Sequence, residues 1–107
     1  MNPSEPYDLS NASYTDTSVN GRSVAISISG IVVNDTSNVS KITVVCETQY
    51  VDVSPLSKDL QKDGPNREYT LLSDRLNPSP DGDGTYITSA TIEVFDTSGV
   101  VIQEKQI

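Results

Sequence analysis

Hydrophobic and polar residues alternate with a period of two in the last part of the chain, from Gly84 to Ile107. The residues that would share one face of an extended backbone there are Tyr86, Thr88, Ala90, Ile92 and Val94. Only Thr88 is polar in this set. Successive side chains of a strand point to opposite faces of its sheet, so the pattern predicts a strand with one buried face.

A turn and a returning strand follow. Asp96 stands at the first position of the turn, where its side chain can bond nearby backbone, and Gly99 stands at the last, where it tolerates a positive φ. Val100, Val101 and Ile102 then begin the second strand of a hairpin. An isolated hairpin is only marginally stable in water, so the pattern indicates that more sheet lies behind it.

Three earlier stretches carry similar alternation. They span residues 24–29, 41–53 and 68–72, and Gly30 shifts the hydrophobic phase after the first of them, which indicates a bulge or bend. Together with the final hairpin they predict an all-β, antiparallel sandwich of the seven-strand class. Its predicted core consists of Val24, Ile26, Ile28, Ile42, Val44, Cys46, Tyr69, Leu71, Ala90, Ile92 and Val94.

The segments between the strands are polar and rich in turn-forming residues. Residues 34–38 and residues 77–84 are predicted turns because they combine asparagine, aspartate, serine, proline and glycine. Residues 54–60 begin with serine and proline and carry leucines four positions apart. A serine cap, a proline in the first turn and this leucine spacing predict a short helical turn in the middle of the chain.

The N-terminal segment differs from the rest of the chain. Residues 1–21 contain no basic residue, and their few hydrophobic side chains are too sparse for the segment to fold alone. We therefore expect an extended N-terminal arm over residues 1–21 and an immunoglobulin-like β-sandwich over residues 22–107. The side chains best suited to anchor the arm on a protein partner or a neighbouring copy are Tyr7, Leu9 and Tyr14.

The length of 107 residues fits one domain with a single core. No hydrophobic run reaches the roughly 18 residues of a membrane-spanning helix, and the first residues lack the basic start and hydrophobic stretch of a secretory signal. The net charge is −8 and no basic patch is present, which argues against a nucleic-acid partner and against an anionic membrane.

Candidate catalytic groups are few. The chain has no histidine and a single cysteine, Cys46, which continues a hydrophobic alternation and is expected to be a small buried residue. Because no nucleophile, base and orienting group are apparent together, we expect a protein that is not an enzyme. The lone cysteine also excludes the internal disulfide of an antibody domain.

The candidate metal site is a pair of carboxylates on a glycine-rich loop. Asp81 and Asp83 alternate with glycines, and calcium favours hard oxygen ligands of this kind. Asp35 or Asp96 could approach them from another loop of a sandwich. We expect a solvated turn without metal here, because the further acidic ligands of an EF-hand loop are absent; calcium binding is the alternative, and we expect no other cofactor.

The chain resembles the immunoglobulin-like and fibronectin-III-like modules of bacterial surface proteins and phage virions. The stretches that carry this resemblance are SVAISISG (23–30), VNDTSNVSKITVVC (33–46) and GTYITSATIEVFDTSGVV (84–101). The tryptophan and paired cysteines of antibody domains are missing, and residues 54–83 match no pattern of these modules. The resemblance implies a β-sandwich that acts as a spacer, decoration or adhesion module, and it carries over no functional residues.

Three functions follow as hypotheses. The first is a non-catalytic structural attachment module on the outside of a larger assembly, in particular a virion decoration or head-tail accessory protein. It is favoured because a sandwich of the extracellular kind without a secretory signal fits a virion, which is assembled in the cytoplasm. The second is an adhesion or spacer module of a bacterial surface protein, on the cell surface or outside the cell. The third is carbohydrate binding, with an exposed Tyr50 or Tyr86 stacked on a sugar.

Overall fold

The computed structural model describes residues 5–49, 55–71 and 86–107, and within them the only regular elements are β-strands. The strands are β1 (Tyr7–Asp8), β2 (Ser13–Val19), β3 (Arg22–Ser29), β4 (Val32–Val33), β5 (Val39–Thr48), β6 (Leu56–Leu60), β7 (Glu68–Thr70), β8 (Ile87–Asp96) and β9 (Val101–Gln106). All strand pairs are antiparallel. The prediction of an all-β, antiparallel fold is confirmed.

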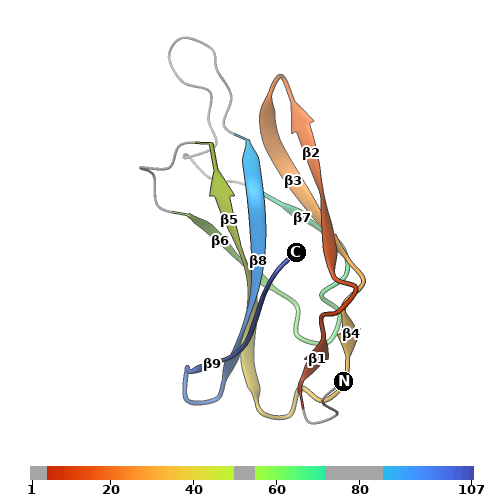
Figure 1. The fold of residues 1–107 in the computed structure, drawn as a ribbon, viewed down its shortest axis with the longest axis vertical. Coiled ribbons are helices and arrows are strands. Elements are labelled where there is room, and N and C mark those ends of the chain that lie inside the picture. Colours follow the sequence, from red (N-terminus) through yellow and green to blue (C-terminus); the bar gives the residue numbers. More distant parts are fainter. Residues whose placement is uncertain (1–4, 50–54, 72–85) are drawn as a thin grey trace.

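The strands form three sheets. β1 pairs with β4, three strands follow the order β2-β3-β7, and four strands follow the order β6-β5-β8-β9. In Figure 1 the long hairpin of β2 and β3 stands on one side of the molecule, and β5, β6 and β8 stand on the other. The short β1–β4 pair lies at the lower end of this arrangement.

One hydrophobic cluster receives side chains from all three sheets. Its members are Tyr7, Leu9, Ile26, Ile28, Ile31, Val39, Ile42, Val44, Cys46, Leu60, Tyr69, Leu71, Ile87, Ala90, Ile92 and Val94. Every residue of the predicted core is therefore buried, except Val24. The period-two pattern succeeded because each long strand turns one face to this cluster.

Val24 is only half-buried because β3 contains an irregularity at this position. Thr17 of β2 lies opposite Ala25, whereas Ser18 lies opposite Ser23, so Val24 is an extra residue without a partner on β2. An inserted residue reverses the alternation of side chains along a strand. As a result Ser23 is buried and Val24 is not.

A second irregularity changes the start of β8. Glu47 lies opposite Ser89 but Thr48 lies opposite Ile87, which leaves Thr88 as the extra residue. Ile87 is consequently buried at 6% exposure, while Tyr86 is 47% exposed. The prediction that Tyr86 shares the buried face of this strand is wrong, because the alternation does not continue through the bulge.

The predicted helical turn over residues 54–60 is also wrong. Residues 56–60 form strand β6, whose pairing with β5 places Leu60 opposite Ile42 and Leu56 opposite Cys46. Leucines four positions apart share a face in a strand as well as in a helix, so the spacing could not separate the two. Pairing with the edge of β5 decided between them, because it gives the segment backbone hydrogen bonds.

Residues 5–21 lie within the fold rather than outside it. β1 pairs with β4, β2 pairs with β3, and the predicted boundary after residue 21 falls in the turn between β2 and β3. Tyr7 and Leu9 belong to the core. A segment too polar to fold alone can still add strands to an existing sheet, because the pairing satisfies its backbone and a few side chains fill the core.

The predicted turns over residues 34–38 and 96–99 are confirmed, whereas the predicted turn over residues 77–84 lies outside the described residues. In the β8–β9 turn, Asp96 Oδ1 accepts hydrogen bonds from the backbone N–H groups of Ser98 at 2.8 Å and Val100 at 2.9 Å, and Gly99 has φ +82°. In the turn over residues 34–38, Asp35 Oδ1 accepts a bond from Ser37 N at 3.0 Å. Aspartate fixes both turns through its own side chain, as its preference for these positions implies.

Candidate partner-binding groove

A groove of about 670 Å³ runs between β1 and β9. It brings together segments from the two ends of the chain, which is visible in Figure 1 where β9 passes beside β1. Its lining residues are Glu5, Tyr7, Asp8, Leu9, Ser10, Ile102, Gln103, Glu104 and Lys105. The sequence predicted Tyr7 and Leu9 as partner-binding residues, but it did not predict that β9 would face them.

The side chain of Gln103 joins the two walls of the groove. Its Oε1 accepts a hydrogen bond from Tyr7 N at 3.0 Å, and its Nε2 donates to Tyr7 O at 2.7 Å and to Glu5 Oε2 at 2.7 Å. A side-chain amide therefore makes the pair of contacts with Tyr7 that a peptide group of a neighbouring strand would make. Along the described residues, no backbone hydrogen bond links β1 directly to β9.

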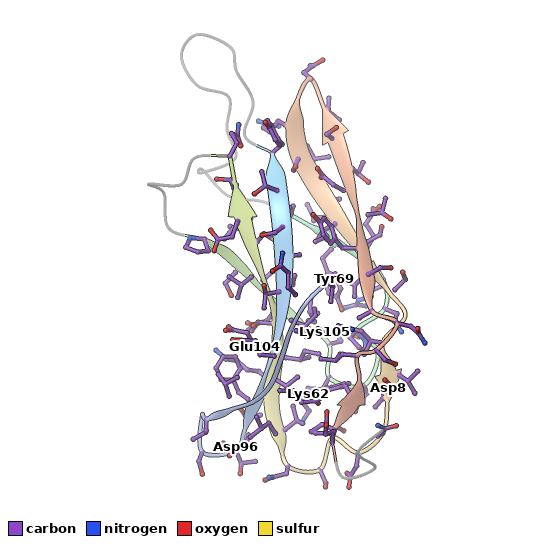
Figure 2. The ribbon with its side chains drawn as sticks, viewed as in Figure 1. Asp8, Lys62, Tyr69, Asp96, Glu104 and Lys105 are labelled. Carbon is purple, nitrogen blue, oxygen red and sulfur yellow. The ribbon has the colours of Figure 1, made fainter. Side chains whose placement is uncertain are left out.

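Lys105 makes the second connection across the groove. Its Nζ donates to Leu9 O at 2.9 Å and to Ser10 O at 3.2 Å, as the direction of its side chain in Figure 2 illustrates. Near these carbonyls, Asp8 accepts hydrogen bonds from the hydroxyl and the N–H of Ser10. Those bonds lower the pKa of Asp8, with a smaller contribution from the charge of Lys105.

Tyr7 holds β1 in place from the side of the core. The residue is fully buried, and its hydroxyl donates to Lys62 O at 2.7 Å. Burial raises the pKa of Tyr7 to about 12, and the nearby Asp63 and Tyr69 add to the rise. The neutral phenol thus fills the core and satisfies one partly buried carbonyl with the same side chain.

The three predicted anchor residues occupy different positions. Tyr7 and Leu9 are buried in the core, and their backbones form one wall of the groove. Tyr14 lies on β2, where it is half-buried against the core, and burial raises the pKa of its hydroxyl. Direct contact of these three side chains with a partner stays a prediction. In the structure Tyr7 and Leu9 use their side chains for the chain's own core.

β9 is an edge strand with an exposed hydrophobic start. It has β8 on one side and ends the four-stranded sheet on the other. Val100, Val101 and Ile102 are 57%, 43% and 40% exposed, although they are consecutive hydrophobic residues. Consecutive exposed hydrophobic residues on an unpaired edge are a feature of surfaces that bind other chains.

The outer face of the four-stranded sheet, opposite the core, carries a row of carboxylates. Thr43 lies between Asp59 on β6 and Glu93 on β8, and Glu93 lies opposite Glu104 on β9. The pKa of Glu93 is raised by burial, then by its hydrogen bond to Glu104 and the charge of that residue, while Lys41 acts in the opposite direction. This face is therefore acidic beside the groove.

A small polar cluster connects the two larger sheets near Cys46. Ser23 Oγ donates to Asp16 Oδ2 at 2.8 Å and accepts a bond from Ile87 N at 3.0 Å. Burial raises the pKa of the Cys46 thiol to about 12, and the charge of Asp16 adds to this effect. Cys46 is buried, as predicted, and it remains a protonated core residue at neutral pH.

The predicted calcium ligands Asp81 and Asp83 lie outside the described residues. Asp35 and Asp96, which were considered as additional ligands, use a side-chain oxygen to accept backbone N–H groups in their own turns. Within the described ranges, no group of three or more histidine, cysteine, aspartate or glutamate side chains could hold a metal ion. For the sugar-stacking hypothesis, Tyr86 is exposed and Tyr50 also lies outside those ranges.

Sequence reasoning missed Gln103, Glu104 and Lys105 as groove residues. A signal was present, since polar residues occupy both faces of this strand from Gln103 onward, and lysine is common on edge strands. The sequence did not indicate which segment lies on the free side of this strand, because β1 is some 95 residues away in the chain.

Comparison of the chain with protein-family models, curated proteins and solved structures finds no match. Among the described residues, no helix is long and hydrophobic enough to cross a membrane.

Proposed function

We propose that this chain is an immunoglobulin-like β-sandwich that serves as a non-catalytic structural attachment module on the outside of a larger assembly. Its specific form would be a virion decoration or head-tail accessory protein. Two larger antiparallel sheets that share one core support the sandwich assignment. An adhesion or spacer module of a bacterial surface protein is the alternative, since it uses the same fold and the same kind of contact.

The observation that carries the attachment function is the exposed edge of β9. Val100, Val101 and Ile102 remain accessible while hydrophobic side chains of the other three strands in the same sheet fill the core. Burial of these three side chains against a partner would remove hydrophobic surface from water, and this burial would stabilise the complex.

Antibody labelling tests this function. Antibodies against the chain should label intact particles from its source if it decorates a virion, or intact cells if it belongs to a surface protein. Labelling that appears only after lysis would contradict both forms of the proposal.

A matched pair of variants then tests the surface. Val101→Lys should weaken attachment to particles or cells that lack the chain, whereas Val19→Lys should not, because Val19 is similarly exposed at 54% but lies on β2. Equal attachment by the two variants would remove β9 from the contact surface.

Carbohydrate binding is the second candidate, and the exposure of Tyr86 favours it. The residue is 47% exposed, and its backbone N–H donates to Gln49 Oε1 at 2.9 Å, which fixes the start of β8. An exposed aromatic ring on a fixed backbone can stack on a sugar. A glycan array with the parent chain and Tyr86→Ala tests this, and binding that survives the substitution would exclude stacking on Tyr86.

A further inference from the structure

The free edge of β9 presents an ordered set of backbone groups. Ile107 N donates to Ala90 O at 2.8 Å, and Ile92 lies opposite Lys105 in the same register. In an antiparallel ladder, hydrogen-bonded and non-hydrogen-bonded positions alternate. The backbone N–H and C=O groups of Glu104 and Gln106 therefore point away from β8, and none of the described residues forms a backbone hydrogen bond with them.

Side chains hold β1 at a distance from this edge. Gln103 reaches Tyr7 and Lys105 reaches Leu9 and Ser10, so the two backbones are joined only through the length of these side chains. These side-chain contacts join β1 to β9, while the backbone N–H and C=O groups of Glu104 and Gln106 have no backbone hydrogen-bond partner on the free side among the described residues. Because side chains rather than backbone hydrogen bonds join β1 to β9, the two strands do not form one continuous sheet, and a groove lies between them.

The charges around the groove are mostly negative. The lining includes three acidic side chains, Glu5, Asp8 and Glu104, and one basic side chain, Lys105. The ammonium group of Lys105 is already engaged by two backbone carbonyls. Glu93 lies opposite Glu104 on the outer face and adds to the negative charge there. A basic segment fits this environment, and an acidic one would be repelled.

We propose that the free edge of β9, beside the groove, binds an extended segment of a partner protein in which hydrophobic and basic residues alternate. The backbone of this segment pairs with the free N–H and C=O groups of Glu104 and Gln106. Its basic side chains lie on the side of Glu104, and its hydrophobic side chains lie on the side of Ile102 and the groove. This inference rests on the proposed attachment function and specifies the contact that it uses.

A synthetic peptide of alternating valine and lysine is the probe. We expect saturable binding by fluorescence anisotropy, weakened by added salt, together with shifts and slower exchange of the Glu104 and Gln106 amide signals in NMR spectra. Four control peptides are needed: one with glutamate in place of lysine, one with the same residues in a non-alternating order, and two that are N-methylated at every second amide, one along each edge. The first two, and the peptide methylated along the edge that faces β9, should bind more weakly.

A charge reversal in the protein provides the matched test. Glu104→Lys should weaken binding of the valine–lysine peptide about tenfold, because it replaces an attraction with a repulsion beside the paired edge. Glu68→Lys makes the same change of charge at an exposed position of β7, outside the groove, and should leave binding unchanged. Circular dichroism and urea unfolding of both variants show whether each is folded.

Several results would overturn the proposal. They are equal binding of the alternating and non-alternating peptides, unchanged binding after N-methylation of either edge, and the absence of binding to the valine–lysine peptide. If the chain forms concentration-dependent dimers and Glu104→Lys disrupts them, a second copy of the chain, not a basic segment, occupies the edge. If the chain labels particles or cells but the peptide does not bind, attachment stands and uses another surface.

Discussion

Gly30 illustrates how much a single residue can constrain this fold. It joins β3 to β4 with φ +81°, a region that side chains disfavour. A β-carbon at this position would lie 2.0 Å from the backbone oxygen of Asn11 and 2.7 Å from its carbonyl carbon. Both the backbone conformation and the close approach of the segment before β2 therefore require glycine, where the sequence predicted only a bulge or bend.

Gly30→Ala should lower the free energy of unfolding by about 2 kcal/mol or more, since it adds backbone strain to a steric clash. Gly64→Ala is the control, because its β-carbon would meet nothing within 4 Å and its φ is not positive. That substitution should change stability by less than about 0.5 kcal/mol. Urea unfolding of both variants is the measurement, and equal losses would contradict the role assigned to Gly30.

The contact between Glu93 and Glu104 makes the stability of the fold depend on pH. The pKa of Glu93 is raised in the fold by burial and by Glu104, so the folded chain binds this proton more readily than the unfolded chain does. The Glu93–Glu104 contact therefore destabilises the fold least at low pH, where Glu93 is protonated. As pH rises through the raised pKa of Glu93, the contribution of this contact to the free energy of unfolding becomes unfavourable.

Glu104→Gln should accordingly stabilise the chain by a few tenths of a kcal/mol near neutral pH, a small value because solvent screens exposed charges. The advantage should vanish at about pH 3, where carboxylates are mostly protonated. Urea unfolding at both pH values checks this, with Glu68→Gln as an exposed control. A gain that is independent of pH would show that relief of like charge is not its cause.

At the scale of elements, strands acquire their positions from neighbours as much as from their own residues. β6 is a strand because β5 offers an edge to it, and β1, only two residues long, is held by pairing with β4 and by the buried ring of Tyr7. The bulges in β3 and β8 change which side chains face inward. Each case depends on a partner that is distant in sequence.

Substitutions of Tyr7 test the anchoring of β1. Tyr7→Ala should cost about 3–5 kcal/mol, as removal of a large buried ring generally does. Tyr7→Phe should cost about 1 kcal/mol, because it leaves Lys62 O without its hydrogen bond. Urea unfolding gives both values, and Tyr86→Phe, with an exposed ring, should be nearly neutral. A small loss in Tyr7→Ala would mean that β1 contributes little to the core.

The raised pKa of Tyr7 adds a test at alkaline pH. The stability provided by its neutral phenol is present below about pH 10, the ordinary tyrosine value, and is lost as pH rises toward about 12. The parent chain should therefore lose more stability than Tyr7→Phe across this interval. Parallel losses in the two proteins would assign the alkaline effect to the other tyrosines.

At the scale of the whole molecule, three sheets share one core, and the two ends of the chain close one side of it. The first strands contribute Tyr7 and Leu9 to the core, and β9 faces them across the groove. The sequence divided the chain into an arm over residues 1–21 and a sandwich over residues 22–107. The structure gives β1 and β2 packing and pairing that an independent arm would not have.

Deletion of residues 1–21 distinguishes the two descriptions. We expect the shortened chain to lose its cooperative urea transition and its dispersed amide NMR spectrum, because β3 loses one of its two partner strands and the core loses Tyr7 and Leu9. An arm that is independent of the fold would leave both unchanged. Strong amide protection across residues 5–19 of the intact monomer would agree with the first outcome.

The residue pattern alone predicts the all-β, antiparallel class, most of the core, and the turns at residues 34–38 and 96–99. Alternation in residues 26–28, 42–46 and 90–94 correctly predicts the buried hydrophobic side chains, because period two is a local property of an extended chain. Aspartate and glycine at Asp96 and Gly99 specify a turn through contacts within a few residues. These features need no knowledge of distant segments.

Features that depend on distant segments were fixed by tertiary contacts. The bulges at Val24 and Thr88, the strand at residues 56–60 and the burial of Tyr7 all depend on which strand lies alongside. The groove has the same origin, since Gln103 and Lys105 meet β1 only after the two ends of the chain come together. Contacts between distant segments leave no periodic trace in either segment, so a single sequence does not reveal them.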